Sequence, residues 1–302
     1  MLKSYTKNIF QLVLILSLAL PLRVHGQVKH ALLVGISKYE NRDVQSEDDE
    51  WKDIHGTNDV QMITPILKRQ GFKTKTLCNR EATAQRIRKE LKALAQRVKV
   101  GDMVYFHFSC HGQPVEDLDG DEEDGWDEAI VPYDAQMKYV KGKYEGNSHI
   151  LDDELHSYLQ QMRKAVGKAG FVCVVIDACH AGGSSRGDEE DTEEAFCRGT
   201  KRGFSATDKP YRPRINALGH FTIPNSPDLS HIAILEACRS YQSNYEIKQD
   251  GKYYGPLSFY VTKTLEISAI SPSLTWILEI KRMMDADRRL VRQNMVYETS
   301  LK

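Results

Sequence analysis

The chain has 302 residues, 27% of them charged, and a formal net charge of −1 at pH 7. This length suits one large domain or two small ones, and the near-neutral charge does not indicate a nucleic-acid-binding protein. The six cysteines have no C-x-x-C spacing and are too sparse for a disulfide scaffold, so a structural zinc site and a disulfide-stabilised mini-protein are both disfavoured.

Residues 1–26 have the pattern of a signal peptide. Lys3 and Lys7 precede an apolar stretch at residues 12–20, and a cleavage position follows before Gln27. The apolar stretch is short for a membrane span, although an uncleaved anchor is the alternative. We therefore predict an exported protein, periplasmic or secreted, with a mature domain over residues 27–302 and no membrane span after cleavage.

Strand-like and helix-like segments alternate along the mature chain. This alternation predicts an α/β fold, a three-layer α/β/α sandwich with a mostly parallel central sheet. No repeat or low-complexity linker divides the chain, and a helical extension is expected over about residues 273–302. Strand patterns lie at residues 30–36, 73–77, 103–109, 172–176 and 231–236, and helical patterns at 57–70, 83–98, 152–166, 257–267 and 273–291.

The apolar run at residues 172–176 leads directly into Asp177-Ala178-Cys179-His180 and two glycines. An unbroken β-branched run this short predicts a strand buried on both faces, and the sites of open α/β sheets lie at the carboxyl ends of such strands. In extended geometry Asp177 and Cys179 share one face. Cys173 is predicted to be a small core residue, whereas Cys179 is a candidate nucleophile.

A thiol nucleophile needs a base, which usually comes from elsewhere in the chain. The strand pattern at residues 103–109 ends in Cys110-His111-Gly112. If this strand neighbours the strand that precedes Cys179, His111 and Cys179 meet at one edge of the sheet as a Cys–His dyad. Taken alone, His111 could instead be a surface or core histidine with a structural role.

Three segments, FHFSCHG, DGDEEDGWDEAIVPYDA and IDACHAGG, occur in this order and resemble motifs of the caspase superfamily, in particular of its bacterial metacaspase-like members. With ALLVGISKYEN and ILEACRSYQSNYE, the resemblance spans about residues 30–265. It implies a caspase-like fold and a cysteine endopeptidase in which His111 activates or protonates and Cys179 attacks the carbonyl carbon. Backbone N–H groups of Gly112 and Cys179 would bind the oxyanion. Cys110 departs from the family, which usually has glycine there.

The resemblance also implies a pocket for the substrate residue that precedes the cut, formed by Asp59, Ser109 and Asp177. Two carboxylates favour a guanidinium or ammonium group and repel an acidic side chain. We therefore predict a peptide or protein substrate with arginine or lysine before the cut, and cleavage after aspartate is disfavoured.

Residues 116–127 are rich in carboxylates. They fit an EF-hand loop only in part, because Glu122 stands where the loop needs glycine. Many related metacaspases bind calcium through acids in this region and at a helix start, which implies Asp127, Asp152 and Asp153 as calcium ligands. The alternative is a solvated acidic loop. No other cofactor is expected.

A second polar loop, residues 184–209, follows Cys179 and carries Arg198, Lys201 and Arg202. The corresponding segment of caspase-like enzymes is where self-cleavage occurs, so we expect a cut after one of these three residues. The alternatives are an uncut loop whose acids bind a cation, and a simple solvated excursion.

Two other interpretations of the whole chain remain open. One is a catalytically silent caspase-like binding or scaffold protein, although the thiol and the histidine are both present. The other is a protease kept dormant by a Cys110–Cys179 disulfide or by the absence of calcium.

Overall fold

The computed structural model describes residues 26–42, 44, 46–120, 122, 124–179, 196–200, 202–212, 221, 223–224, 226–290 and 292–302. All of the predicted signal peptide except Gly26 lies outside these residues, as do Lys201 and the first part of the loop after Cys179. Within the described ranges, no helix has the length and apolar character that crossing a membrane requires.

Six strands form the central sheet in the order β11-β8-β7-β3-β1-β2. Five of them pair in parallel, and β11 pairs antiparallel with β8 at one edge. The predicted sandwich with a mostly parallel sheet is therefore confirmed. The strands are β1 (Lys29–Gly35), β2 (Phe72–Cys78), β3 (Met103–Ser109), β7 (Phe171–Asp177), β8 (His231–Glu236) and β11 (Val296–Thr299).

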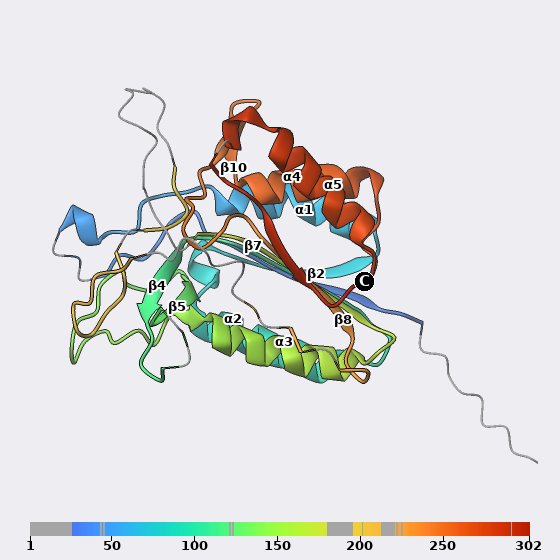
Figure 1. Ribbon diagram of the computed structural model, residues 1–302, viewed down its shortest axis with the longest axis horizontal. Helices are drawn as coiled ribbons and strands as arrows, with labels where there is room; N and C mark the ends of the chain where they lie inside the picture. Colours follow the sequence, from blue (N-terminus) through green and yellow to red (C-terminus); the bar gives the residue numbers. More distant parts are fainter. Residues whose placement is uncertain are drawn as a thin grey trace, which may run out of the picture.

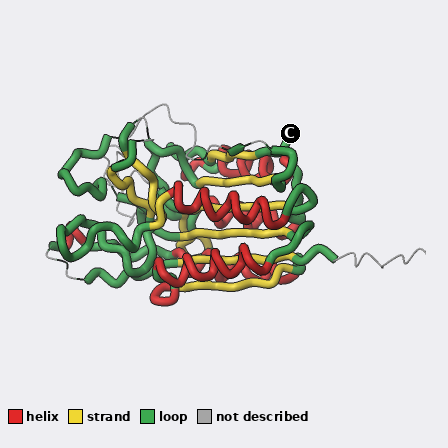
Figure 2. Tube along the Cα trace, turned by 90° about the horizontal axis from the view of Figure 1, so that it is seen from below, coloured by secondary structure: helices red, strands yellow, loops and turns green. Residues whose placement is uncertain are grey.

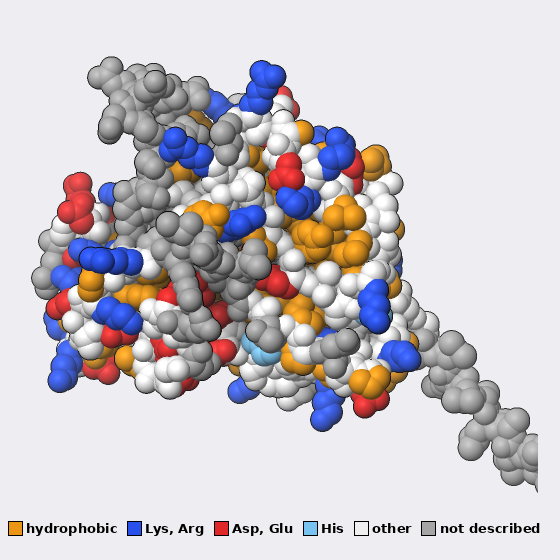
Figure 3. Space-filling view, in the orientation of Figure 1, with side chains coloured by type: hydrophobic (Ala, Val, Ile, Leu, Met, Phe, Trp, Pro, Cys, Tyr) orange, Lys and Arg blue, Asp and Glu red, His pale blue; other side chains and the backbone are white. Residues whose placement is uncertain are grey.

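Helices cover both faces of this sheet (Figure 1). On one face lie α2 (Ala84–Arg97) and α3 (Asp152–Val166), which lie in front of the strands and run along them in Figure 2. On the other lie α1 (Gly56–Arg69), α4 (Pro256–Ile267) and α5 (Leu274–Ala286). Positive and negative side chains are interspersed over the face shown in Figure 3, in keeping with the near-neutral net charge.

The central strands are buried on both faces, which explains their unbroken apolar sequences. Side chains of β3 alternate between two apolar clusters: Phe106 and Phe108 belong to one, and Met103 and Tyr105 to the other. Cys173 of β7 is fully buried in the second cluster, so its prediction as a core residue is confirmed.

Two smaller sheets were not predicted from the sequence. The first is antiparallel and consists of β4 (Gly112–Glu116), β5 (Trp126–Ile130) and β6 (Ile150–Leu151), and the second pairs β9 (Ile247–Gln249) with β10 (Lys252–Tyr254). Short 3₁₀ turns lie at Glu47–Asp49, Asn79–Glu81 and Arg288–Leu290. The predicted helical extension is only partly helical, because β11 returns to the central sheet.

Candidate active site

The two candidate catalytic residues follow adjacent strands. β3 and β7 pair in parallel with Ser109 opposite Asp177. His111 follows the end of β3 by two residues, and Cys179 follows the end of β7 by two residues. Since parallel strands end at the same edge of a sheet, both residues lie at that edge. The expectation that these strands are neighbours is confirmed. Both side chains are buried, with exposures of 2% and 0%.

The imidazole of His111 is positioned by groups that the sequence did not indicate. Its Nε2 lies 2.9 Å from the backbone oxygen of Lys52, and its backbone N–H donates to Tyr39 Oη at 2.7 Å. The ring of Trp51 stacks on the imidazole with a centroid distance of 5.0 Å. Because a carbonyl oxygen only accepts hydrogen bonds, Nε2 must carry the hydrogen, and Nδ1 is left as the basic nitrogen.

The Nδ1 atom of His111 is buried and has no hydrogen-bond partner among the described residues. Desolvation lowers the pKa of His111 to about 4, so the ring is neutral near pH 7. A neutral imidazole with an uncommitted nitrogen in a buried site is suited to act as a general base.

The thiol of Cys179 is fully buried, and this burial raises its pKa above the ordinary value. The thiols of Cys197 and Cys238 lie beside it. Cys110 belongs instead to the apolar core cluster on the α2 and α3 side. None of the six cysteines forms a disulfide in the structure, so the Cys110–Cys179 disulfide considered above is not formed.

Residues 196–198 pass through this site as an added strand. Cys197 forms an antiparallel bridge with Tyr245. Arg198 N–H donates to the Asn244 oxygen at 2.9 Å, and Glu246 N–H donates to the Phe196 oxygen at 2.9 Å. Pairing an extended segment with exposed backbone groups is a common way of holding a peptide. The chain's own segment is therefore bound as a peptide would be.

The carbonyl oxygen of Arg198 accepts two hydrogen bonds, from Gly112 N–H at 3.0 Å and from Cys179 N–H at 3.1 Å. These are the N–H groups that the family resemblance implied for an oxyanion hole. The next residue is Gly199, and a Cβ atom there would lie 2.5 Å from Cys179 Sγ and 2.2 Å from the Cys179 oxygen. The thiol thus lies directly against the Arg198–Gly199 segment, and only glycine fits after Arg198.

The side chain of Arg198 is fully buried among acidic groups. Its Nη2 lies 2.7 Å from Asp59 Oδ2 and 2.8 Å from Glu246 Oε1, and its Nη1 lies 3.6 Å from Asp177 Oδ1. Nη1 also donates to Ser109 Oγ at 2.7 Å. The structure therefore brings together all three predicted pocket residues around one guanidinium.

Glu246 is a pocket residue that the sequence analysis missed. Its Oε1 accepts from Arg198 Nε at 3.1 Å, and its carboxylate also accepts from the backbone N–H of His55 at 2.7 Å. A signal was present, because Glu246 is the last residue of the ILEACRSYQSNYE segment that contributed to the resemblance. The segment was recognised, but no role was assigned to its acid.

Three carboxyl groups surround the single cation of Arg198. This environment shifts the pKa values of Asp59, Glu246 and Arg198. Burial raises the pKa of Asp59 to about 7, although Arg198 opposes the shift. Burial also disfavours the charge of Arg198, but the surrounding carboxylates raise its pKa above the ordinary value. For Glu246, burial is outweighed by Arg198 and His55, which lower its pKa. The buried guanidinium of Arg198 and the carboxyl groups around it thus shift one another's pKa values.

We expect the binding of arginine in this pocket to strengthen as the pH rises above about 7, the pKa of Asp59 with Arg198 in place, because the empty pocket holds the proton to a higher pH. A cation favours the charged form, so binding and proton release are coupled. The check is the KM for an arginine peptide measured on both sides of that pH, which should fall as the pH rises. Asp59→Asn should remove the dependence, and an unchanged pH profile in that variant would assign it to another group.

The predicted calcium ligands are divided between two elements. Asp127 lies in β5 and Asp152 at the start of α3, and both are buried, whereas Asp153 is exposed. Asp152 Oδ1 accepts from the Glu128 N–H at 3.3 Å. Within the part of the chain that the structure describes, no three His, Cys, Asp or Glu side chains are grouped to hold a metal ion. Calcium binding stays an untested prediction, and no chemical step below depends on it.

Comparisons with known proteins place the chain in a family. Metacaspase-1 of Schizosaccharomyces pombe is 35% identical over 167 residues, which is 52% of this chain and 34% of the relative. Metacaspase-1 of Eremothecium gossypii is 32% identical over 165 residues, 51% of this chain and 32% of the relative. The match thus spans about a third of the length of these relatives.

A crystal structure of a Geobacter sulfurreducens protein superposes with a TM-score of 0.60 at 18% identity, covering 90% of this chain and 93% of the other, which shows a shared fold. The family model described as Caspase domain matches residues 28–294. Because this match covers most of the chain and confirms the resemblance of the motifs, the chain belongs to the caspase-domain family.

Proposed function

We propose that this protein is a cysteine endopeptidase that cuts after arginine or lysine and that it cleaves its own chain between Arg198 and Gly199. One observation carries the proposal: the Arg198 carbonyl oxygen accepts from both oxyanion-hole N–H groups while its guanidinium fills the acidic pocket. These are the contacts that an enzyme must make with the residue before the cut.

The same observation selects among the three basic residues of the loop. Arg202 lies away from the pocket and forms an ion pair with Asp49. Lys201 lies outside the described residues. Arg198 is the basic residue whose carbonyl group and side chain meet the candidate dyad and the acidic pocket together.

In the proposed reaction, Nδ1 of His111 takes the proton of the Cys179 thiol as the sulfur attacks the carbonyl carbon of Arg198. Gly112 and Cys179 N–H groups hold the resulting oxyanion, and each such donor contributes about 3 kcal/mol. His111 then gives its proton to the Gly199 nitrogen, and the C–N bond breaks to leave a thioester. Water, deprotonated by His111, hydrolyses the thioester and releases the carboxyl group of Arg198.

Burial favours a concerted proton transfer over a preformed ion pair. It raises the pKa of Cys179 and lowers that of His111 to about 4, so both groups are neutral at rest. The uncut chain also fills its own site with Arg198, whose side chain is 0% exposed. We infer that other substrates are excluded until the Arg198–Gly199 bond is cut and the segment leaves the pocket. This is a dormant form of the enzyme that requires no disulfide.

The proposal is tested by hydrolysis of three fluorogenic peptides that differ only in the residue before the cut: arginine, lysine or aspartate. The purified chain should hydrolyse the first two and not the third, and Asp59→Asn should raise the KM for arginine by losing a buried charge pair worth about 2–5 kcal/mol. Asp53→Asn is the matched control, because Asp53 is exposed. Assays with reductant, and with calcium or a chelator, test the predicted calcium stimulation. Preferential cleavage after aspartate, or no hydrolysis, would contradict the proposal.

A further inference from the structure

The chain beyond the Arg198–Gly199 bond is held by an enclosure of rings around Phe204. The centroid of the Phe204 ring lies 5.8 Å from that of Tyr139, 5.6 Å from that of Tyr144 and 4.6 Å from that of His149. Gly146 closes another side, where a Cβ atom would lie 2.9 Å from Phe204 Cε1. Tyr139, Tyr144, Gly146 and His149 are called the aromatic cage below.

Phe204 has the features of an anchor rather than of a core segment. It is 3% exposed, and it is the one buried residue between Arg202 and Arg212. Its neighbours are polar and bind a single surface carboxylate: Ser205 Oγ and Thr207 Oγ1 each donate to Glu116 at 2.6 Å. A polar strip with one enclosed ring is typical of a bound peptide.

The strand β4 connects the cage to the catalytic centre. Gly112 at its start donates to the Arg198 oxygen at 3.0 Å. Further along the same strand, the Pro114 oxygen accepts from Phe204 N–H at 2.8 Å, and Glu116 N–H donates to the Phe204 oxygen at 2.9 Å. One short strand thus contacts the residue before the cut and the residue in the cage, which sets the spacing between them.

Gln113, also in β4, links the backbone of the bound segment to the cage. Its Nε2 donates to the Arg202 oxygen at 3.0 Å, and its Oε1 lies 2.8 Å from His149 Nε2. The side chain of Gln113 is fully buried. The buried amide of Gln113 therefore holds the bound backbone and the ring of His149 in a fixed relation. The contacts at the Arg198–Gly199 bond do not require this link.

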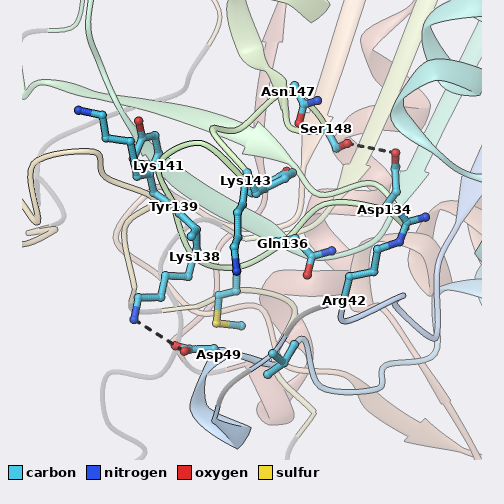
Figure 4. A pocket seen from close by; sticks show the side chains of 14 residues that line it. Arg42, Asp49, Asp134, Gln136, Lys138, Tyr139, Lys141, Lys143, Asn147 and Ser148 are labelled. Carbon is cyan, nitrogen blue, oxygen red and sulfur yellow. Dashed lines mark hydrogen bonds and ion pairs between the residues drawn. The ribbon is translucent and has the colours of Figure 1, made fainter.

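A cavity of about 650 Å³ adjoins the cage and shares Tyr139 and Tyr144 with it (Figure 4). Asp49 on its wall pairs with Lys138, as Figure 4 shows, and with Arg202 of the bound segment. Asp49 thus provides an acidic contact for the bound segment.

We propose that the aromatic cage is a substrate subsite that selects an aromatic side chain at the sixth position after the cut, and that Asp49 favours a basic side chain at the fourth. The positions are counted from Gly199 as the first, which makes Arg202 the fourth and Phe204 the sixth. The inference rests on the proposed cut at Arg198 and extends it to a substrate class: segments of the form Arg-Gly-x-x-Arg-x-aromatic.

The first test follows self-cleavage in freshly synthesised full-length chain. Phe204→Ala should slow the cut at Arg198 about tenfold, as expected for loss of a central aromatic anchor. Phe204→Tyr, which retains the ring, should stay within about twofold of the wild-type rate. Phe72→Ala is the matched control, because Phe72 is similarly buried but lies at the opposite end of the sheet, at the start of β2. Equal rates for Phe204→Ala and the wild type would overturn the proposal.

The second test uses peptides cut in trans by the Phe204→Ala enzyme after it has cut its own chain, when the acidic pocket and the cage are both vacant. Two peptides of the sequence of residues 196–207, with phenylalanine or alanine at the sixth position, should differ about tenfold in kcat/KM for the Arg–Gly bond, chiefly through KM. Adding Tyr144→Ala should abolish this difference. Equal kcat/KM for the two peptides, by an enzyme that does hydrolyse a fluorogenic arginine substrate, would overturn the subsite and leave the proposed function standing.

A binding measurement decides the matter if no arginine substrate is hydrolysed, an outcome that would overturn the proposed function. Fluorescence anisotropy would compare labelled peptides Gly-Thr-Lys-Arg-Gly-Phe and Gly-Thr-Lys-Arg-Gly-Ala on a Cys179→Ala chain in which residues 199–207 are replaced by glycine and serine, so that the chain's own anchor no longer fills the cage. The proposal expects tighter binding of the phenylalanine peptide, and equal affinities would overturn it without reference to catalysis.

Discussion

Cys179→Ala should leave the purified chain at a single mass, whereas the wild-type chain separates into two fragments that end at Arg198 and begin at Gly199. The substitution removes the sulfur that lies against this bond. Peptidase activity should fall by about 10⁴-fold or more, because members of a catalytic unit fail together. Intact-mass spectrometry measures both outcomes.

His111→Ala should have the same effect, because it removes the base with the uncommitted Nδ1. Cys173→Ala is the matched control: it also removes a buried thiol from the β7 region, but one within the apolar core. That variant should be cut as the wild type is, with a modest loss of stability from a small cavity. A wild-type cut after Arg202, or cleavage in the Cys179→Ala chain, would contradict the assignment.

The sheet and the dyad were predictable because their signals are local. β3 and β7 are uninterrupted apolar runs, buried on both faces, that end in a histidine and a cysteine. In a parallel sheet the end of a strand is also the edge of the sheet, so local position implies spatial proximity. Only the adjacency of the two strands had to be assumed.

The groups that orient His111 could not be predicted in this way. The hydrogen bond to Lys52 uses a backbone oxygen, which carries no mark of residue type, and it spans 59 positions along the chain. β4 was also missed, because GQPVE has no alternating pattern and contains a proline. Such features depend on tertiary contacts rather than on local sequence.

The choice of Arg198 among three basic residues illustrates the same limit. Charge and distance from Cys179 suit Arg198, Lys201 and Arg202 equally. The structure distinguishes Arg198 by its backbone pairing with Asn244, a partner 46 positions away. That pairing sets which carbonyl group reaches the oxyanion hole. The composition of the loop predicts that the chain is cut within it. The register in which residues 196–198 pair with residues 244–246 predicts that the cut follows Arg198.

Arg198→Ala should abolish the cut and also destabilise the uncut fold, because three buried carboxyl groups share the guanidinium as an ion-pair partner. Asp59, Asp177 and Glu246 would each lose this partner. Removing one partner of a buried ion pair costs about 3–5 kcal/mol of unfolding free energy. Arg198→Lys, which retains a cation, should still be cut and should recover part of this stability. Arg202→Ala, at a half-exposed surface ion pair, should unfold as the wild type does.

The loss of unfolding free energy in Arg198→Ala should depend on pH, and Asp59 determines the direction of this dependence. Its pKa is already raised to about 7 in the folded chain by burial, and loss of Arg198 raises it further. An unfolded aspartate has a pKa of about 3.9. The folded state therefore binds the proton more tightly, and stability is lost as the pH rises from the unfolded value through the folded one. Up to about pH 7 this loss runs in parallel in the two chains, because both hold the Asp59 proton, and above that pH it continues only in Arg198→Ala. Urea unfolding below pH 7 and well above pH 7 should therefore show a smaller deficit for Arg198→Ala at the lower pH. An equal deficit at the two pH values would show that Asp59 does not take up the proton that replaces the guanidinium charge.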